Sequence, residues 1–496
     1  MSASGQARKT RGMAGTSAGA APAPLQYGNG RQPGSGFYAR GAGAGHHAAH
    51  CRPCNRYGRR RPLPVPSDNP VLSPSRERWL LLTLAGIQFT HILDFMIMMP
   101  LGPRFTQLFA ISDAQFGLLV SAYTLSAGVS GLLAGTYVDR FGRKRLLLVL
   151  YGLFGLATLA CGVAPGYALL MVARILAGAF GGVLSALSQT IVADVVPFER
   201  RGRAMGIVMT SFSVSTVAGV PLGLLLAQYG GWHLPFFAIA ALVALLALQA
   251  ARTLPTLTAH LQAARGRTAL GGITQVLADH NHRWAFLFSA LLMFTGFTVI
   301  PYITIYMQTN AGVRADQVPL LYLCGGLVTL FTARLFGRLT DRWGKVFTYR
   351  RLALACTLPL LAITLVRGVP LWAVIAVSTL MFTFLSGRMI PGMAIVASAA
   401  QAPLRGTFMT LNTSVQSAAM GLASFVGGLL ISRDAQGLVQ HYWMAALVGI
   451  GASLLSMVVV GKLQLYGAAP SAPSSEPQAA AAAQSGQGAP SARGSD

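Results

Sequence analysis

The chain has 496 residues, of which 53% are hydrophobic and only 10% are charged. So few charged side chains cannot cover the surface of a soluble protein of this length, which excludes an ordinary soluble globular fold. Long apolar runs recur instead, most of them roughly 20 residues long, the length that crosses the hydrocarbon core of a bilayer. The formal net charge of +25 would suit a nucleic-acid partner, but its placement along the chain argues for a membrane.

Residues 1–76 are rich in Gly, Ala, Pro and Arg and lack apolar periodicity, so we expect a disordered cytoplasmic N-terminal tail. His46, His47, His50, Cys51 and Cys54 lie in this tail at spacings that fit transition-metal ligands, but low-complexity sequence explains them as well and we expect no metal site. No apolar segment precedes residue 70, so no cleavable signal peptide is expected.

Twelve apolar runs predict twelve membrane-spanning helices. They begin near Trp79, Phe116, Leu146, Tyr167, Met205, Pro235, Trp284, Val318, Leu352, Leu371, Phe408 and Trp443. The fifth, tenth and eleventh runs are interrupted by Gly or Pro, and the ninth is short. The expected fold is an all-α polytopic membrane protein, because helices satisfy every backbone group without help from water.

The twelve spans divide into two groups of six. The first six-helix bundle is predicted over residues 77–252 and the second over residues 283–463. A cytoplasmic connector over residues 253–282 joins them and has room for at most one short helix. Residues 464–496 are again rich in Ala, Ser, Pro and Gln and are expected to form a second disordered tail.

Arginine and lysine cluster on every second loop, after the second, fourth, sixth and eighth spans. The opposite loops carry only single cations, namely Arg104, Arg314, Arg367 and Arg433. This alternation follows the positive-inside rule and places both termini in the cytoplasm. The membrane therefore accounts for the net charge, and no nucleic-acid partner is expected.

A basic loop motif occurs twice in the chain. The copies are Gly135-Thr-Tyr-Val-Asp139-Arg140-Phe-Gly142-Arg143 and Gly337-Arg-Leu-Thr-Asp341-Arg342-Trp-Gly344-Lys345. Asp139 and Asp341 lie 202 positions apart, and Arg201 and Arg405, which open spans five and eleven, lie 204 apart. The two bundles are therefore expected to be pseudo-symmetric, the architecture of carriers that rock around a central site.

These motifs resemble the major facilitator superfamily over nearly the whole folded chain. The stretch from Gly131 to Lys144 matches the cytoplasmic signature of that family between spans two and three. Arg174-Ile-Leu-Ala-Gly178 is similar to the arginine-bearing motif of span four in the 12-span drug:proton antiporter branch, and the sequence around Asp94 is similar to span one of sugar-efflux and multidrug-efflux members. The resemblance implies a secondary active transporter that works by alternating access.

A further resemblance lies in span five. Gly219-Val-Pro221-Leu-Gly223 is similar to the antiporter motif of that span, which implies a helix bend. The match departs from the family pattern in two places: Val220 separates the glycine from the proline, and His233 follows Gly231-Trp232 where arginine is common. These departures leave the direction of transport open.

The two Asp-Arg loops predict a conformational latch. Spans five and eleven begin at the cytoplasmic face, and a helix N-terminus carries a partial positive charge that attracts a carboxylate. We expect Asp139 to dock on the start of span eleven and Asp341 on the start of span five. The latch set comprises Gly135, Asp139, Arg140, Gly142, Arg143, Gly337, Asp341, Arg342 and Gly344. The alternative is an ordinary cluster of surface charges.

Asp94 is the one acid that lies well inside a predicted span, and such residues are costly and mark functional sites. Arg174 lies at similar depth, counted at about 1.5 Å per residue, and is predicted to pair with Asp94. His91 precedes Asp94 by three residues on the same helical face. We predict a proton-coupling site of Asp94, Arg174 and His91, although His91 is also typical of a packing histidine. Asp113 is expected to be a fixed surface acid.

Span seven carries Thr295, Thr298, Tyr302 and Tyr306 at spacings of three and four, which places them on one face. We predict that Thr298, Tyr302 and Tyr306, together with Arg388 of span ten, line the substrate cavity. The alternative for the span-seven row is a helix–helix contact through its hydroxyl groups.

The function that fits best is proton-coupled efflux of a small organic molecule, such as a drug, sugar or metabolite, by a monomer in the bacterial inner membrane. Its partners are the lipid bilayer, the substrate and protons, with no cofactor and no metal. Proton-driven uptake of a sugar or organic acid is the main alternative, and a transport-inactive sensor or a polytopic membrane enzyme is a weaker one. The chain has no Walker A sequence, which argues against an ATP-driven pump.

The topology predicts the outcome of reporter fusions. A reporter enzyme that is active only in the periplasm should be active after Gly231 and inactive after Arg267, because only the first position lies on the outer side. Activity normalised to expression measures this, and the reverse pattern would contradict the topology.

Overall fold

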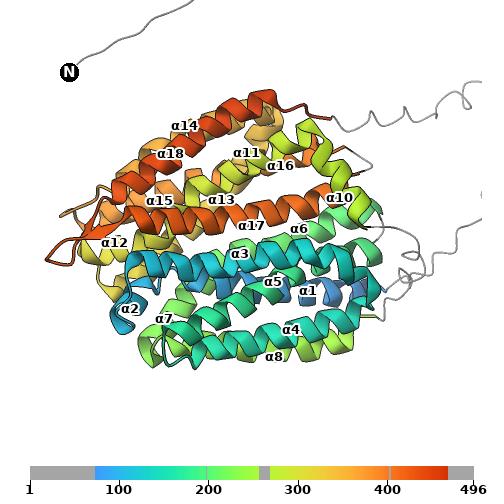
Figure 1. The fold of residues 1–496 in the computed structure, drawn as a ribbon, viewed down its shortest axis with the longest axis horizontal. Coiled ribbons are helices and arrows are strands. Elements are labelled where there is room, and N and C mark those ends of the chain that lie inside the picture. The colour runs from blue at the N-terminus through green and yellow to red at the C-terminus, as the bar shows by residue number, and fades with distance from the viewer. Residues whose placement is uncertain (1–72, 197, 256–268, 402–403, 467–496) are drawn as a thin grey trace, which may run out of the picture. The chain divides into compact units, whose positions relative to one another are not determined.

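The computed structural model describes residues 73–196, 198–255, 269–401 and 404–466, all within one unit, Pro66–Asp496. Long helices run side by side along a common direction (Figure 1). The His- and Cys-rich segment at residues 46–54 and most of both predicted tails lie outside the described residues. Helix α1 begins at Pro74, so residues 74–76, which we assigned to the tail, are helical.

The first bundle contains α1 (Pro74–Ile97), α2 (Gly102–Leu108), α3 (Asp113–Tyr137), α4 (Arg143–Gly162), α5 (Tyr167–Val195), α6 (Phe198–Val214), α7 (Val220–Gly230) and α8 (His233–Thr253). Helix α10 (Ala269–Ala278) lies in the connector. The second bundle contains α11 (His280–Phe297), α12 (Ile303–Thr309), α13 (Val318–Trp343), α14 (Lys345–Ala362), α15 (Leu371–Gly387), α16 (Met389–Ala399), α17 (Arg405–Leu430) and α18 (Tyr442–Val459). Strands β1 (Ser432–Arg433) and β2 (Val439–Gln440) form a short antiparallel hairpin between α17 and α18.

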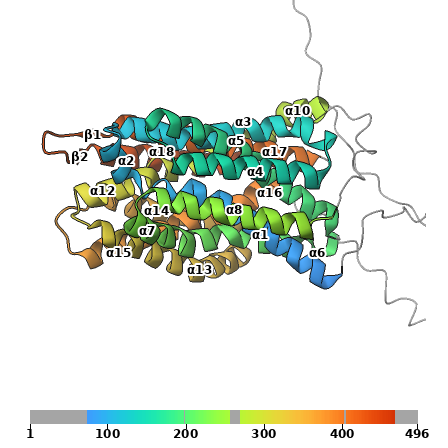
Figure 2. The same ribbon diagram turned by 90° about the horizontal axis from the view of Figure 1, so that it is seen from below.

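The two ends of the helices differ. One end carries α2, α12 and the β1–β2 hairpin, and we call it the hairpin end (Figure 2). The other carries α10 and the start of α6, and we call it the basic-loop end because both Asp-Arg motifs lie there. Helix α1 begins and α18 finishes at the basic-loop end (Figure 1), as an even number of spans requires.

Eleven helical segments of the described chain are long and apolar enough to cross a membrane. They coincide with the predicted spans, with α14 as the missing ninth. Helix α14 has 18 residues, and Lys345, Arg350 and Arg351 lie within its first two turns, which reduces its apolar length. It packs beside α15 and α18 as the other spans do and completes the second bundle. The prediction of an all-α polytopic fold is confirmed.

Local chemistry explains where several helices start. Ser112 and Gln115 form a reciprocal capping box at the start of α3, and the Asp279 carboxylate caps α11 by accepting from the His282 amide. Gly344 turns α13 into α14 with a φ of 87°, a conformation that favours glycine. Its counterpart in the first motif, Gly142, has a φ of −61° and needs no such freedom, so the two copies of the motif turn differently.

Among the described residues, spans five, seven and ten are interrupted. The sequence indicated the interruptions of spans five and ten but not that of span seven. Span five passes through a π-helical turn, η2 (Ser215–Gly219), two residues before Pro221, which has no amide hydrogen for a regular helix. Span seven breaks at a 3₁₀ turn, η3 (Ile300–Tyr302), which contains Pro301. Span ten breaks between α15 and α16. The predicted interruption of span eleven is wrong, because α17 is continuous and its glycines serve close packing.

The two bundles meet most extensively where α3 lies along α17. Glycines allow this approach: a Cβ added at Gly128 would lie 3.0 Å from the Ser414 carbonyl oxygen, and one added at Gly421 would lie 2.8 Å from the Thr124 hydroxyl. Small residues let helix backbones approach in membranes, where no hydrophobic force drives helices together. The backbones of α3 and α17 are therefore in contact rather than separated by side chains.

The same device joins α5 to α3 and generates a stability prediction. A Cβ at Gly178 would lie 2.2 Å from the Tyr123 carbonyl oxygen, whereas a Cβ at Gly152 meets nothing within 4 Å. Gly178→Ala should lower the melting temperature in detergent, by the equivalent of about 1–3 kcal/mol of overpacking. Gly152→Ala is the matched control and should leave it unchanged or slightly raised. Equal melting temperatures for the two variants would contradict the α3–α5 packing.

Candidate functional site

Asp94 and Arg174 form a buried ion pair inside the first bundle. Asp94 lies near the end of α1 and Arg174 near the start of α5, and the two helices run in opposite directions. The Arg174 Nη1 donates to Asp94 Oδ2 at 2.9 Å and to the Asp94 carbonyl oxygen at 3.1 Å. Both side chains are 0% exposed. The structure thus brings together the two residues that depth counting along the helices had paired.

Aromatic rings surround this pair. The guanidinium carbon of Arg174 lies 4.3 Å from the centre of the Tyr123 ring, a cation–π contact from α3. Phe95 stacks on the same ring with a centroid separation of 5.4 Å. Asp94 Oδ1 and Arg174 Nε and Nη2 are buried without a hydrogen-bond partner among the described residues. The pair is therefore held tightly but is only partly satisfied, which makes its ionised form expensive to keep.

His91 lies one helical turn from Asp94, towards the basic-loop end. Its ring is held by packing: the centroid is 6.0 Å from that of Tyr123, and a Cβ at Gly181 would lie 2.4 Å from His91 Cδ2. Both ring nitrogens are buried without a partner among the described residues. A packing histidine usually forms hydrogen bonds. His91 therefore keeps free capacity to accept or donate a proton.

The span-seven residues serve helix contacts in this state. Thr298 donates to the Thr295 carbonyl oxygen at 3.2 Å and packs on α18, where a Cβ at Gly449 would lie 2.8 Å from the Thr298 hydroxyl. The Tyr302 hydroxyl donates to the Ser424 carbonyl oxygen at 2.5 Å, and the Tyr306 ring lies 5.0 Å from that of Tyr442. All three are buried, so they do not line an open cavity here.

Arg388 is also enclosed in protein. It lies at the break between α15 and α16, is 1% exposed, and donates from Nη2 to the Leu292 carbonyl oxygen at 2.7 Å. Its Nε and Nη1 are buried without a partner among the described residues. The structure places it inside the second bundle, apart from the Asp94–Arg174 pair in the first.

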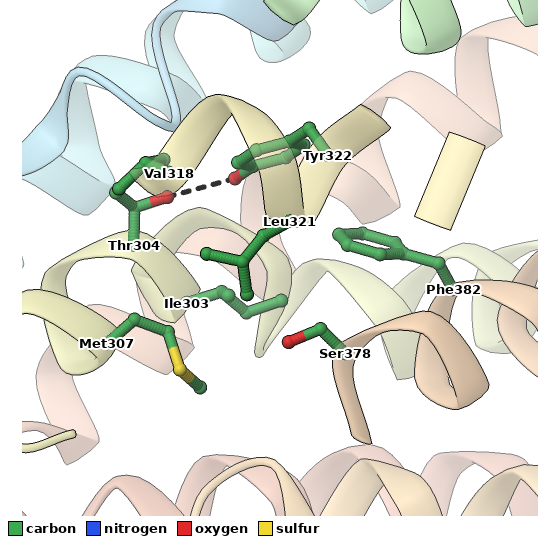
Figure 3. A pocket seen from close by; sticks show the side chains of 8 residues that line it. All are labelled: Ile303, Thr304, Met307, Val318, Leu321, Tyr322, Ser378 and Phe382. Atoms are coloured by element: carbon green, nitrogen blue, oxygen red, sulfur yellow. Dashed lines mark hydrogen bonds between the residues drawn. The ribbon is translucent and has the colours of Figure 1, made fainter. Parts of the chain in front are cut away.

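Two hollows occur near the hairpin end, and both are small. The first, of about 10 Å³, lies within the second bundle and is drawn in Figure 3. Its lining residues are Ile303, Thr304, Met307, Val318, Leu321, Tyr322, Ser378 and Phe382, with a hydrogen bond of 3.0 Å between Thr304 and Tyr322. The second, of about 70 Å³, lies between α2, α7, α12 and the start of α13. Neither approaches the several hundred Å³ typical of a drug-sized site.

The first Asp-Arg motif is only partly described. The backbone of η1 (Val138–Arg140) is placed, but the Asp139 side chain and the surroundings of Gly135 lie outside the described residues. Arg143 donates from Nε to Asp194 Oδ2 at 3.1 Å and so ties this motif to the end of α5. The sequence pattern gives no sign of this pairing, because it joins a loop to a helix end 51 positions away.

In the second motif, Asp341 and Arg342 are exposed at the end of α13. Within the described part of the chain, the Asp341 carboxylate has no hydrogen bond and no ion pair. Among the described residues at the start of α6, none makes the expected contact with Asp341, and the latch stays a prediction.

One acid is located differently from expectation. Asp113, which we took for a surface acid, is 4% exposed, so that assignment is wrong. Arg433 of the β hairpin covers it and donates to both carboxylate oxygens, at 2.8 and 2.7 Å. These two hydrogen bonds raise the pKa of the Arg433 guanidinium. The capping-box residues around Asp113 were the one sequence signal that it begins a helix rather than sits on a free loop.

Comparison with known proteins identifies the class. The family model of the Major Facilitator Superfamily matches residues 84–424 and again residues 286–487, so the chain belongs to this superfamily. The second match begins in the second bundle. The chain is thus a multi-pass membrane transporter and not an enzyme, and the predicted fold of two pseudo-symmetric six-helix bundles is confirmed.

Relatives and solved structures agree with this assignment. The uncharacterised transporter YtbD of Bacillus subtilis is 25% identical over 68% of this chain and 85% of its own length. Multidrug resistance protein 2 of the same organism is 29% identical over 35% of this chain and 43% of its own length. Among solved structures, a bacterial homologue of the human lysosomal transporter Spinster, in an inward-facing, occupied conformation, matches 79% of this chain and 97% of its own with a TM-score of 0.61 at 15% identity. A D-xylose–proton symporter matches 77% of this chain and 97% of its own with a TM-score of 0.60 at 18% identity.

The latch prediction concerns a state that closes at the basic-loop end. Asp139→Asn and Asp341→Asn keep the side-chain shape but lose the attraction to a helix N-terminus, worth about a twofold to fivefold change in population each. Paired spin labels across the basic-loop end should report more molecules open there, while the melting temperature stays unchanged. Asp316→Asn, an exposed acid on the opposite side, is the control. Unchanged distance distributions in both motif variants would rule out the latch.

Proposed function

We propose that this transporter exports a small organic molecule in exchange for protons and that Asp94 carries the coupled proton. The observation that supports this most directly is the fully buried Asp94–Arg174 pair, with unsatisfied polar atoms on both partners. Two relatives that match about a third of this chain bear the names of multidrug resistance proteins, which favours efflux. The chain carries no nucleotide-binding motif, so a proton gradient is the natural energy source.

Two opposing effects act on the Asp94 carboxyl group. Burial in the bundle favours the neutral acid, while the Arg174 guanidinium 2.9 Å away favours the carboxylate. When Asp94 takes up a proton on Oδ1, the oxygen without a hydrogen-bond partner among the described residues, the pair changes from a net charge of zero to a net charge of +1. An arginine stays charged at any physiological pH. Protonation therefore leaves an uncompensated cation in a low-dielectric interior, which favours a conformation that hydrates the site.

Arg174 keeps its position through this change because two of its contacts do not depend on the carboxylate charge. Its Nη1 still donates to the Asp94 carbonyl oxygen, and its guanidinium still lies over the Tyr123 ring. The proton then leaves when closure of the bundles removes water from the site, because a dry site disfavours the uncompensated Arg174 cation. This gives the site two discrete states linked to the conformation of the bundles.

His91 provides the next proton-accepting group towards the basic-loop end. Its ring nitrogens are free of protein partners, and the side chain lies one turn from Asp94 on α1. The proposed role is to pass the proton between Asp94 and the side of the membrane that the basic loops face. By the positive-inside rule that side is the cytoplasm of a bacterial cell, with the protein in the inner membrane. The proposed transporter acts as a monomer.

The substrate cavity remains a proposal built on Thr298, Tyr302, Tyr306 and Arg388. These side chains are enclosed in the described state, so lining a cavity requires that the bundles separate. Proton-driven uptake is the second candidate, since the fold is shared with a D-xylose–proton symporter and the fold alone does not set direction. Efflux predicts that cells with the gene accumulate less substrate, and uptake predicts that they accumulate more.

The coupling role predicts the behaviour of Asp94→Asn. The amide cannot exchange a proton but fills the same space, so transport driven by an imposed pH gradient in vesicles should be lost. Exchange of labelled for unlabelled substrate without a gradient should persist. Arg174→Ala should also impair transport, because the acid then stays neutral through more of the cycle.

Asp316→Asn is the control for this experiment, because it removes an exposed acid whose partner is Arg314 of the same loop. It should transport at the wild-type rate. Gradient-driven accumulation by Asp94→Asn at the wild-type rate would show that Asp94 does not carry the proton.

A further inference from the structure

The hairpin end holds an ion pair between the two bundles that the transport proposal does not use. Arg433 of strand β1 donates from Nε to Asp113 Oδ2 at 2.8 Å and from Nη2 to Asp113 Oδ1 at 2.7 Å. Asp113 belongs to α3 of the first bundle, and the hairpin belongs to the second. The two residues are 320 positions apart in sequence. Such a two-point guanidinium–carboxylate contact fixes orientation as well as distance.

The hairpin that carries Arg433 is rigid and fastened to its own bundle. The Asp434 carboxylate accepts hydrogen bonds from the Leu438 amide at 2.8 Å and from Gln440 Nε2 at 2.8 Å, which closes the turn. The Asn310 amide group, at the end of α12, bonds both the N–H and the carbonyl oxygen of Val439 at 2.9 Å. Arg433 therefore moves with the second bundle and not as a free loop.

Asp113 is equally fixed in the first bundle. It is the first residue of α3, where the capping box of Ser112 and Gln115 holds the helix start. A helix N-terminus stabilises a carboxylate even without a cation. The charge on Asp113 is thus tolerated after Arg433 leaves, and the ion pair can break and form again without changing protonation.

Close packing continues beneath the ion pair. The Tyr302 side chain of the second bundle fits where glycines leave room: a Cβ at Gly117 would lie 2.0 Å from its hydroxyl, and one at Gly428 would lie 2.6 Å away. One turn further along α3 than Gly117, Ser121 donates to the Gly421 carbonyl oxygen of α17 at 2.6 Å. Separation of the bundles at this end therefore has to break the ion pair and withdraw Tyr302 together.

We propose that Asp113 and Arg433 form the lock of the gate at the hairpin end, so that this ion pair sets how often the two bundles separate there. The lock acts on the equilibrium between conformations. The proposal depends neither on the direction in which substrate moves nor on whether Asp94 carries the proton. The lock and the predicted latch at the other end both place a carboxylate at the start of a helix. In the lock, that carboxylate also pairs with an arginine from the opposite bundle.

Distance measurements between spin labels at Gln107 and Leu365 test the lock. Both residues are exposed, neither lies in the hairpin, and they belong to different bundles at the hairpin end. The labels are placed in the full-length chain with its five native cysteines replaced by serine. Asp113→Asn and Arg433→Gln should each raise the ratio of separated to closed molecules by about tenfold, because each removes the two-point charged contact that joins the bundles at this end.

The double variant Asp113→Asn/Arg433→Gln distinguishes loss of the contact between the two residues from separate effects of each substitution. If the two residues act through their mutual contact, the double variant should shift the ratio no more than either single variant does. Arg433→Lys keeps the charge but loses the two-point contact, and a smaller shift is expected. Asp316→Asn removes an exposed ion pair within one loop of the second bundle and should shift nothing.

Two results would overturn the lock. One is an unchanged distance distribution in both single variants, and the other is a double-variant shift that equals the product of the single shifts. The measurement is made without substrate or pH gradient, so a failed coupling role for Asp94 leaves its outcome untouched. Monodisperse elution and a wild-type melting temperature for Arg433→Lys confirm that the fold is intact.

Discussion

The ion pair between Asp94 and Arg174 is the constraint around which the first bundle is built. Neither charge survives in a bilayer interior without the other, and the pair joins α1 to α5 while Tyr123 of α3 covers the guanidinium. Three helices can pack closely around one ion pair only if one of them carries small side chains on the face that the other two contact. Helix α5 supplies that face: a Cβ at Gly178 or Gly181 would collide with α3 or α1. The charge pair and the glycine face are therefore parts of one structure.

Each end of the molecule carries an aspartate next to a helix terminus, and within the described chain the aspartate is paired at one end and unpaired at the other. At the hairpin end a carboxylate at a helix start is covered by Arg433 of the other bundle, and the contact is closed. At the basic-loop end Asp341 is exposed and unpaired among the described residues. A transporter that rocks about its centre needs contacts of this kind that cannot be satisfied at both ends together. The observed state, with one end joined and Asp341 free, is consistent with that requirement.

Sequence reasoning succeeded where distance along a helix determines position. Apolar length placed the spans, and counting residues from the span ends paired Asp94 with Arg174. It failed where partners come from elements whose relative position no periodicity encodes. Asp113 and Arg433 meet because a hairpin folds back over a helix start, and Arg143 meets Asp194 across a loop. Helix continuity was misjudged for a similar reason: glycines in α17 serve contact with α3, whereas Pro301 does interrupt span seven.

The span-seven hydroxyls illustrate why a polar face does not by itself identify a binding site. The spacing of Thr298, Tyr302 and Tyr306 is correct for one face, but in the observed state that face is occupied by α17, α18 and neighbouring side chains. Tyr302 fits beside Gly117 of the first bundle, which is the contact that separation at the hairpin end removes. Tyr302 is also one of the residues proposed to line the substrate cavity. Under that proposal, contact at the gate and contact with substrate are roles of one side chain in two conformations.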